Sequence, residues 1–326
     1  MRTWMLGLAL AALPLLAQAQ TRAEAPIRGV ELSDGTPRYA VPITVGGVTV
    51  DAGLDSGSTG LRVLPGVVPP DQAKGARGTS YSYDSGTELN GVISEVTVGI
   101  GGLSGPAPVE LVRKAGCRGL ARCPAEKVPF DQFGIQGNGL PGEGFKAILG
   151  INMGPDDTPN PLMKLGVKRW IIELPLRDDP KPGRLILNPT DQEIQGYTIF
   201  KIDPAFADRH GGLHDALRGC VVDTKTKRSF CGPMDLDTGA PGIQVGWSTA
   251  EAAFPAGDPA QVVFARGNTP VLAADFEVGA RAVSSRMSVR TEPRQPGARI
   301  YLGVMPYMGF SVLYDPAAGT IGLKPR

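Results

Sequence analysis

The chain has 326 residues, which is enough for two domains of ordinary size or one large β fold. Apolar residues make up 42% of it, and 33 Lys and Arg against 32 Asp and Glu leave a formal net charge of +1. Such a small charge gives no bulk attraction to nucleic acid or to an anionic membrane, so we expect neither as a partner. The 44 Gly and 30 Pro are spread along the chain, which favours turns over long helices.

Residues 1–19 have the pattern of a signal peptide. Arg2 supplies a positive start, residues 5–16 form an apolar run, and Ala-Gln-Ala at 17–19 fits a cleavage site. A buried or membrane-spanning helix is the alternative, but the run is short for a bilayer and contains Pro14. No other segment is apolar enough to span a membrane. We therefore expect an exported protein, either periplasmic or extracellular.

The chain after residue 19 reads as short strands and turns. Residues 39–45 and 48–54 are predicted strands joined by a Gly46-Gly47 turn. Residues 92–100 alternate between apolar and polar side chains, which predicts a strand with one buried face. The apolar runs at 170–172 and 185–187 are most simply core strands.

Helical signals are few. Asn160 followed by Pro161 predicts a short helix over 161–165, with proline at its first position. Ser248 and Glu251 have the spacing of a capping box, which predicts another helix over 248–254. The sequence therefore predicts a mainly β protein with a few short helices.

Four cysteines occur as two close pairs, Cys117 with Cys123 and Cys220 with Cys231. Four cysteines allow three connectivities, and export permits disulfides, so we expect the two local pairs to be bonded. A zinc site is the alternative, but the C-x₂-C spacing is absent.

His210 and His214 are the only histidines. Their spacing of four would place both on one helix face for a metal, but Gly211-Gly212 between them breaks such a helix. We interpret this segment as a surface loop and expect no metal. A serine hydrolase is also disfavoured, because no G-x-S-x-G motif surrounds Ser56 or Ser58.

A ten-residue pattern occurs twice, as LDSGSTGLRV at 54–63 and LDTGAPGIQV at 236–245. Each copy is followed by an apolar segment that ends in glycine, at 147–150 and at 300–303. A third Asp-Ser-Gly at 84–86 lacks the apolar frame and reads as a hairpin tip. The order of parts therefore indicates two similar halves.

If the two halves pack about a pseudo-two-fold axis, Asp55 and Asp237 face each other. Two carboxylates in contact cannot both ionise easily, so the pair holds a single proton. The charged partner can take a proton from a bound water, while the protonated partner can hydrogen-bond a substrate carbonyl oxygen. This chemistry is attack of water on an amide without a covalent intermediate.

The residues beside each aspartate fit that arrangement. Gly57 and Gly239 remove Cβ atoms, which lets backbone N–H groups approach the carboxylates. The hydroxyls of Ser56 and Thr238 can hydrogen-bond across the interface and keep the two loops in register.

Over roughly residues 35–326 the sequence resembles the pepsin-like aspartic proteases of the bacterial type. Residues 54–58 and 236–239 are similar to the two catalytic loops of that family, and residues 83–87 are similar to its flap hairpin. Residues 147–150 and the segment from Tyr301 to Leu323 resemble family strands, and Cys220 and Cys231 stand where the family often has a small disulfide loop. Proton sharing by two carboxylates is a known property of this family and is not an independent prediction.

The resemblance implies a mainly β, two-lobed fold, with an N-terminal lobe at 27–180 and a C-terminal lobe at 181–326. It implies a monomer without a cofactor, whose cleft binds an extended peptide or protein substrate partly through backbone hydrogen bonds to the flap. The implied site residues are the catalytic pair Asp55 and Asp237, the supporting residues Ser56, Gly57, Ser58, Thr238 and Gly239, and the flap residues Tyr83, Ser85 and Gly86.

The sequence departs from the family at several positions. Ser58 can hydrogen-bond Asp55, but its counterpart Ala240 has no hydroxyl, so the pKa of Asp237 should be higher and the pH optimum less acid than in gastric relatives. Arg62 stands where the family usually has a tryptophan that hydrogen-bonds the flap tyrosine. Few residues separate Ala19 from the first strand, so we expect no long basic propeptide.

A non-catalytic peptide-binding or inhibitor protein with the same fold is the alternative. A chain freed from catalysis can lose one aspartate, and this chain keeps both. The sequence therefore favours an aspartic endopeptidase.

Overall fold

A computed structural model of the protein describes residues 21–69, 77–119, 123–176, 181–202, 214–279, 282–292 and 298–326. The expected signal peptide lies outside these residues. In the part of the chain that is described, no helix is long and apolar enough to cross a membrane. The fold is mainly β, as predicted, and its strands form two large sheets.

The larger sheet contains thirteen strands within the described residues. From one edge to the other they are β11 (Thr198–Lys201), β20 (Thr320–Pro325), β19 (Phe310–Asp315), β9 (Trp170–Glu173), β10 (Gly183–Leu187), β1 (Ala23–Glu31), β2 (Pro37–Val45), β3 (Val48–Asp55), β8 (Ala147–Ile151), β4 (Thr59–Val63), β7 (Leu103–Cys117), β6 (Thr87–Ile100) and β5 (Arg77–Ser82).

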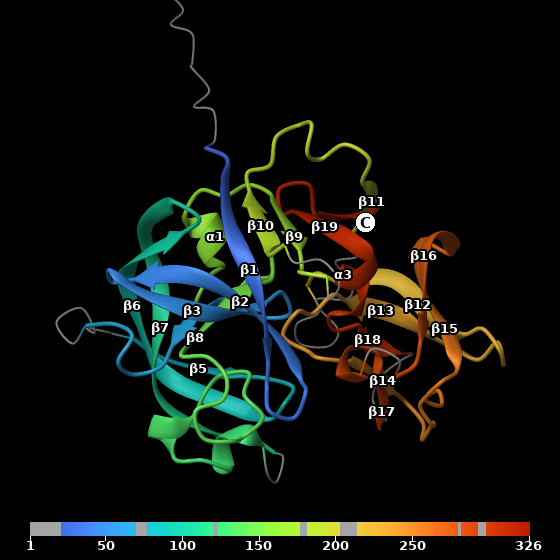
Figure 1. Ribbon diagram of the computed structural model, residues 1–326, viewed down its shortest axis with the longest axis horizontal. Helices are drawn as coiled ribbons and strands as arrows, with labels where there is room; N and C mark the ends of the chain where they lie inside the picture. The colour runs from blue at the N-terminus through green and yellow to red at the C-terminus, as the bar shows by residue number, and fades with distance from the viewer. Residues whose placement is uncertain are drawn as a thin grey trace, which may run out of the picture.

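The smaller sheet contains seven strands within the same described ranges. Their order is β16 (Thr269–Glu277), β15 (Pro259–Arg266), β12 (Leu217–Asp223), β13 (Ser229–Asp235), β18 (Arg299–Tyr301), β14 (Ile243–Trp247) and β17 (Met287–Thr291). Figure 1 shows β2 to β8 on the left, the smaller sheet on the right, and β9, β10 and β19 between them at the top. The helices are short, as in α1 (Pro161–Lys164) and α3 (Met305–Gly309).

The same set of strand pairings occurs in both sheets. In the larger sheet β3 pairs parallel with β8, β8 antiparallel with β4, and β4 parallel with β7. In the smaller sheet β13, β18, β14 and β17 pair in the same sequence of directions. Asp55 lies opposite Gly150, and Asp235, two residues before Asp237, lies opposite Tyr301, two residues before Gly303. The internal repeat predicted from the sequence is therefore confirmed in the strand topology.

Most of the predicted elements are present. The Gly46-Gly47 turn joins β2 and β3, and both glycines have positive φ, at 59° and 83°. Asn160 caps α1 by accepting hydrogen bonds from two backbone N–H groups of the first turn. The expected boundary near residue 180 falls between β9 and β10, which pair with each other in the larger sheet.

The helix predicted over 248–254 is wrong, because this segment has no helical turn. Phe254 is buried against Phe230, with ring centroids 5.4 Å apart, and Arg228 donates a hydrogen bond to the Ala252 carbonyl. These contacts hold the segment in an irregular conformation and outweigh the capping signal of Ser248 and Glu251.

The core strands and the disulfides are those predicted from the sequence. β9 and β10 are almost wholly buried, and Trp170 of β9 stacks on Tyr314 of β19 at 5.6 Å. Cys117 is bonded to Cys123 and Cys220 to Cys231, so the local pairing is confirmed and no cysteine is left for zinc. Disulfides of this kind are typical of a non-reducing compartment, such as that of exported proteins.

Candidate active site

The loops that carry Asp55 and Asp237 meet between the two sheets. Asp55 is the last residue of β3 and is 4% exposed, and Asp237 follows the end of β13. A Cβ atom added to Gly57 would lie 2.4 Å from Asp237 Cγ, and one added to Gly239 would lie 2.6 Å from Asp55 Oδ1. Each glycine therefore packs against the opposite carboxyl group, and only a residue without a side chain fits there.

Ser56 and Thr238 join the two loops by reciprocal hydrogen bonds. The Ser56 N–H donates to Thr238 Oγ1 at 3.0 Å, and the Thr238 N–H donates to Ser56 Oγ at 2.9 Å. Each hydroxyl also donates across the interface, from Ser56 to the Leu236 carbonyl at 2.6 Å and from Thr238 to the Leu54 carbonyl at 2.9 Å. These buried bonds fix the position of one aspartate relative to the other.

Tyr307 adds a support that the sequence reasoning missed. Its hydroxyl donates to the Leu236 carbonyl at 3.0 Å and contacts Ser56 Oγ at 2.9 Å and the Tyr314 hydroxyl at 2.6 Å. Tyr307 lies on α3 and is fully buried. No local pattern marks it, because its role depends on how α3 packs under the two loops.

The two carboxyl groups have different hydrogen-bond partners. Asp55 accepts bonds from the Gly57 N–H at 3.0 Å, the Ser58 N–H at 3.2 Å and the Ser58 hydroxyl at 2.7 Å. Asp237 accepts one from the Gly239 N–H at 2.7 Å. The Asp55 loop therefore stabilises a negative charge better than the Asp237 loop does.

Burial raises the pKa of Asp237 well above its usual range, and the nearby carboxylates of Asp55 and Asp235 raise it further. A side-chain hydrogen bond with Asp55 acts in the same direction. Asp237 is thus the carboxyl group that keeps a proton at pH values where an ordinary carboxyl group has lost it.

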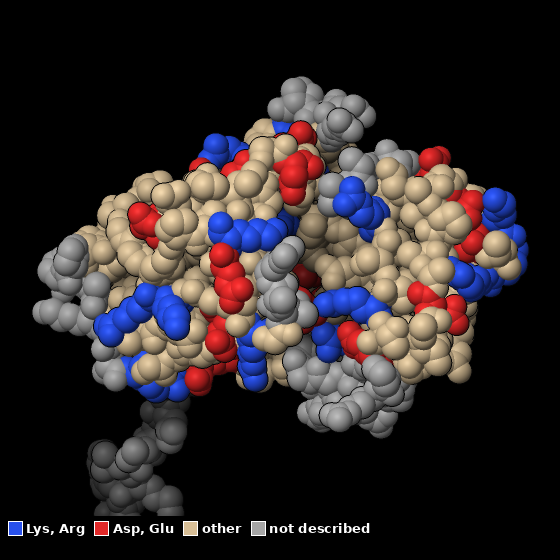
Figure 2. All heavy atoms as spheres, turned by 90° about the horizontal axis from the view of Figure 1, so that it is seen from below, with Lys and Arg blue, Asp and Glu red and all other residues tan. Residues whose placement is uncertain are grey.

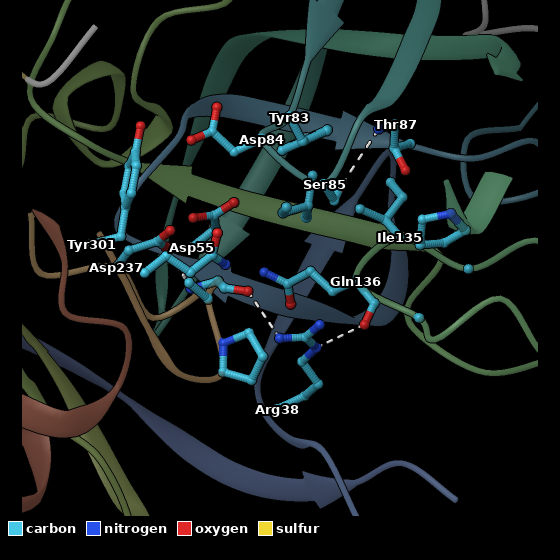
Figure 3. Close-up of a pocket in the computed structure, with 18 of the residues that line it drawn as sticks. Arg38, Asp55, Tyr83, Asp84, Ser85, Thr87, Ile135, Gln136, Asp237 and Tyr301 are labelled. Atoms are coloured by element: carbon cyan, nitrogen blue, oxygen red, sulfur yellow. Dashed lines mark hydrogen bonds between the residues drawn. The ribbon is translucent and has the colours of Figure 1, made fainter. Parts of the chain in front are cut away.

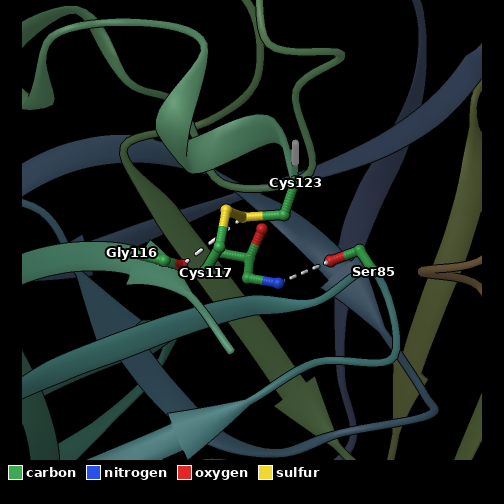
Figure 4. Close-up of a disulfide and its surroundings, with 5 residues drawn as sticks. Ser85, Gly116, Cys117 and Cys123 are labelled. Atoms are coloured by element: carbon green, nitrogen blue, oxygen red, sulfur yellow. Dashed lines mark hydrogen bonds between the residues drawn. A yellow bond between two sulfur atoms is a disulfide. The ribbon is translucent and has the colours of Figure 1, made fainter. Parts of the chain in front are cut away.

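The β5–β6 hairpin lies across the cavity from the two aspartates (Figure 3). Its turn closes with a hydrogen bond from the Gly86 N–H to the Tyr83 carbonyl at 2.8 Å, and Ser85 is exposed at its tip. Tyr83 lines the cavity, and its buried hydroxyl has no hydrogen-bond partner among the described residues. The Cys117–Cys123 disulfide lies beside Ser85, near the turn of this hairpin (Figure 4).

Ion pairs connect the hairpin turn to the smaller sheet. Asp84 lies 3.1 Å from Arg299 and 3.7 Å from Arg290, measured from carboxylate oxygen to guanidinium nitrogen. The contact spans the space above the two aspartates, so the hairpin is held over them.

Arg62 is a fully buried cation beneath the hairpin. Its guanidinium pairs with Glu110 at 2.9 Å and with Asp156 at 3.2 Å, and it lies 3.6 Å from the centroid of the Tyr81 ring. The Tyr81 ring in turn contacts Tyr83, with centroids 4.9 Å apart. Position 62 is where the pepsin-like proteases usually have a tryptophan. Here the Arg62 cation supports the hairpin through the Tyr81–Tyr83 pair.

Two cavities flank the aspartates, and Asp55 and Asp237 line both. The first has a volume of about 180 Å³ and an apolar end formed by Phe133, Ile135 and Ile148. The second has a volume of about 350 Å³ and polar walls, which include the four residues Asp235, Asp156, His214 and Arg299. We call them the apolar cavity and the Asp235 cavity.

Arg38 closes one side of the apolar cavity. It donates to the Gln136 carbonyl at 2.7 Å and to the Gly239 carbonyl at 2.9 Å, as Figure 3 shows. The Arg38 side chain thus links the Asp237 loop to Gln136 and places a cation near both aspartates. Nothing in the local sequence marks Arg38, whereas Asp235 is a carboxylate two residues before the predicted Asp237.

The described residues contain no candidate metal site, and the face drawn in Figure 2 has no patch of one charge sign. Within the described ranges, no group of three His, Cys, Asp or Glu side chains could hold a metal ion. His214 lines the Asp235 cavity, while His210 and most of the loop predicted around it lie outside the described residues. Charged side chains of both signs are interspersed on the face drawn in Figure 2.

No protein-family model and no curated protein matches the chain.

Proposed function

We propose that the protein is an aspartic endopeptidase with a two-lobed, pepsin-like fold, in which Asp55 and Asp237 are the catalytic pair. The observation that carries the proposal is the reciprocal packing of the two loops, with each glycine against the opposite carboxyl group. The unequal hydrogen bonding and the raised pKa of Asp237 support the sharing of one proton.

In this mechanism ionised Asp55 takes a proton from a water held between the two carboxyl groups. The water oxygen bonds to the substrate carbonyl carbon, while protonated Asp237 gives its proton to the carbonyl oxygen. The resulting gem-diol loses the amine when the C–N bond breaks and the nitrogen takes a proton from Asp55. One hydroxyl proton returns to Asp237, so a carboxylic acid and an amine leave and the pair regains its starting state.

The substrate is an extended peptide lying between the β5–β6 hairpin and the aspartates, with an apolar side chain in the apolar cavity. Tyr83, Ser85 and Gly86 belong to the hairpin and would close over the peptide. The two disulfides fit an exported enzyme, either periplasmic or extracellular. We expect a monomer that needs no cofactor.

The test is hydrolysis of an unfolded protein by the mature protein between pH 2 and pH 8. Asp55→Asn and Asp237→Asn variants, each with a cooperative thermal transition, are the matched controls. We expect hydrolysis by the wild type and its loss in both variants. Hydrolysis that persists in either variant contradicts the proposed pair.

A non-catalytic peptide-binding protein is the second candidate. The Tyr83 hydroxyl has no partner among the described residues, and the turn is held by ion pairs of Asp84, so the hairpin differs from the family pattern. A folded wild type that binds peptides in the cleft and hydrolyses none at any pH would favour this candidate.

A further inference from the structure

Asp235 is a buried carboxyl group that the proposed reaction does not use. It is the last residue of β13, two residues before Asp237, and is 2% exposed. Its Oδ1 atom makes no hydrogen bond to any described residue. Burying a polar atom without a partner is unfavourable, so native proteins retain such atoms mainly where a ligand or a function uses them.

The cavity in front of Asp235 is acidic. Asp84 and Asp156 also line it, with side chains 50% and 21% exposed, and Asp55 and Asp237 form its edge. Its resident guanidinium belongs to Arg299, which is bound to Asp84 and to the Tyr301 hydroxyl. Arg299 and Arg290 neutralise Asp84, and Arg62 neutralises Asp156. The carboxyl groups of this wall that have no ion pair within the described residues are therefore Asp235 and the proton-sharing pair.

The chemistry of the wall selects among possible occupants. An apolar side chain would leave Asp235 Oδ1 without a partner, and an anionic one would meet several carboxylates at short range. A lysine or arginine side chain supplies both a donor to Oδ1 and a compensating charge, and such charge-assisted hydrogen bonds are the strong ones.

We propose that Asp235 determines the specificity of this cleft, and that the Asp235 cavity binds a lysine or arginine side chain of the substrate adjacent to the peptide bond held at Asp55 and Asp237. This inference rests on the proposed peptide-binding function and adds the class of substrate to it.

Because Asp235 can ionise, the preference for a basic side chain should depend on pH. Burial and the carboxylate of Asp55 together raise the pKa of Asp235 to about 7, although Arg299 opposes the rise. Asp235 is therefore mostly neutral below pH 7 in the empty cavity, and a basic side chain binds more tightly as the pH rises from 5 to 8. The titratable and charged groups that face Asp235 across this cavity are Asp55, Asp84, Asp156, His214, Asp237, Arg299 and Tyr301.

The experiment measures binding, so it does not depend on hydrolysis. Fluorescent peptides that differ only in arginine or norleucine, on one side or the other of a central bond, are titrated at pH 8 into the Asp55→Asn protein. The same peptides are titrated into Asp55→Asn/Asp235→Asn. Asp55→Asn/Asp191→Asn is the control for loss of one negative charge, because Asp191 is 95% exposed.

We expect arginine to be preferred over norleucine by about tenfold to a hundredfold at one of the two positions. The preference should fall below about threefold in the Asp235→Asn background and remain in the Asp191→Asn background. Equal affinity for the two peptides at both positions, or a preference unchanged by Asp235→Asn, overturns the inference.

Two further measurements distinguish failure of this inference from failure of the proposed protease activity. If Asp235→Asn does not fold, the preference measured at pH 5 and pH 8 in the Asp237→Asn protein, which keeps the Asp55 carboxylate, decides, since a preference that does not grow with pH contradicts a role for Asp235. Hydrolysis by the wild type without an arginine preference overturns this inference alone. An arginine preference in binding without any hydrolysis overturns the proposed protease and leaves the basic-residue site supported.

Discussion

The Asp55 loop and the Asp237 loop share one ten-residue pattern and follow strands with the same pairings, yet their carboxyl groups have different hydrogen-bond partners. Asp55 accepts three hydrogen bonds, of which Ser58 supplies two, whereas Asp237 accepts one. One of the two missing bonds follows from the sequence, because Ala240 has no hydroxyl where the first loop has Ser58. The other follows from the loop conformation, because the Ala240 N–H donates to the main-chain carbonyl of Asp237 and not to its carboxylate.

This comparison shows how a duplicated pattern can serve two chemical roles. The shared residues place the carboxyl groups against each other, and the residue that differs gives Asp55 a hydroxyl donor that Asp237 lacks. In the proposed reaction Asp55 is the base and Asp237 is the acid. The predictions that follow alter first the shared geometry and then the difference between the loops.

The largest effect is expected from Gly57→Ala. The new Cβ atom would lie 2.4 Å from Asp237 Cγ, so the carboxyl group must move out of its position. Displacements of about 1 Å in a catalytic group commonly lower activity about a hundredfold, and we expect at least that loss in kcat/KM. Gly309→Ala is the control, because a Cβ atom there meets nothing within 4 Å. Equal activity of the two variants would contradict the packing described for the loops.

The next effect is on stability. Thr238→Val leaves the Ser56 N–H and the Leu54 carbonyl without their partner in a buried interface. Each unsatisfied buried group costs about 1–3 kcal/mol, so we expect the free energy of unfolding to fall by about 3 kcal/mol. Denaturant unfolding of Thr238→Val is compared with that of Thr49→Val, whose hydroxyl is on an exposed residue of β3. A loss no larger than that of Thr49→Val would show that the reciprocal bonds contribute little.

The two aspartates should differ in the sign of their effect on stability. The raised pKa of Asp237 means that its contribution to stability is present below the unfolded pKa of about 4 and is lost as the pH rises. Asp237→Asn removes this pH-dependent loss of stability. We therefore expect the free energy of unfolding of the variant to exceed that of the wild type by about 1 kcal/mol or more at pH 7, and by a smaller margin at pH 4. Asp55→Asn should destabilise, because a neutral amide oxygen accepts the three hydrogen bonds more weakly.

Thermal and denaturant unfolding at pH 4 and pH 7 check this pair of variants. The wild type measured at both pH values is the reference, and the two variants serve as controls for each other because both replace a carboxyl group by an amide. Changes of the same sign in both variants at pH 7 would contradict the assigned difference between the loops.

Much of this site follows from the sequence because the pattern is repeated. The alignment of the two ten-residue segments indicated Asp55 and Asp237, and in each half the strand before the aspartate pairs with the predicted partner segment. The local disulfides followed from the spacing of the cysteines together with the expected export. These features depend on residues close together in the chain or on a comparison of two copies.

The supports that the sequence did not reveal come from distant parts of the chain. Arg38 contacts the Asp237 loop across 201 residues, and Tyr307 contacts Ser56 across 251 residues. No periodicity or motif records such contacts, since they arise only when sheets and helices pack together. The helix predicted over 248–254 failed for the same reason, because packing of Phe254 outweighs a local capping signal.

The sharpest test of the comparison makes the two loops alike. Ala240→Ser adds a hydroxyl at the position equivalent to Ser58, where it can donate to Asp237 as Ser58 donates to Asp55. A hydrogen bond to the ionised form lowers the pKa of Asp237, so Asp237 loses its proton at a lower pH. We expect the alkaline limb of the kcat/KM profile to move about one unit towards acid. Ser58→Ala removes the hydroxyl donor of the other loop and leaves the partners of Asp237 unchanged, so it should not move the alkaline limb. A general disturbance of the site would instead act alike in both variants. If Ala240→Ser moves the acid limb instead, Asp55 rather than Asp237 holds the proton, and the roles assigned to the two loops are reversed.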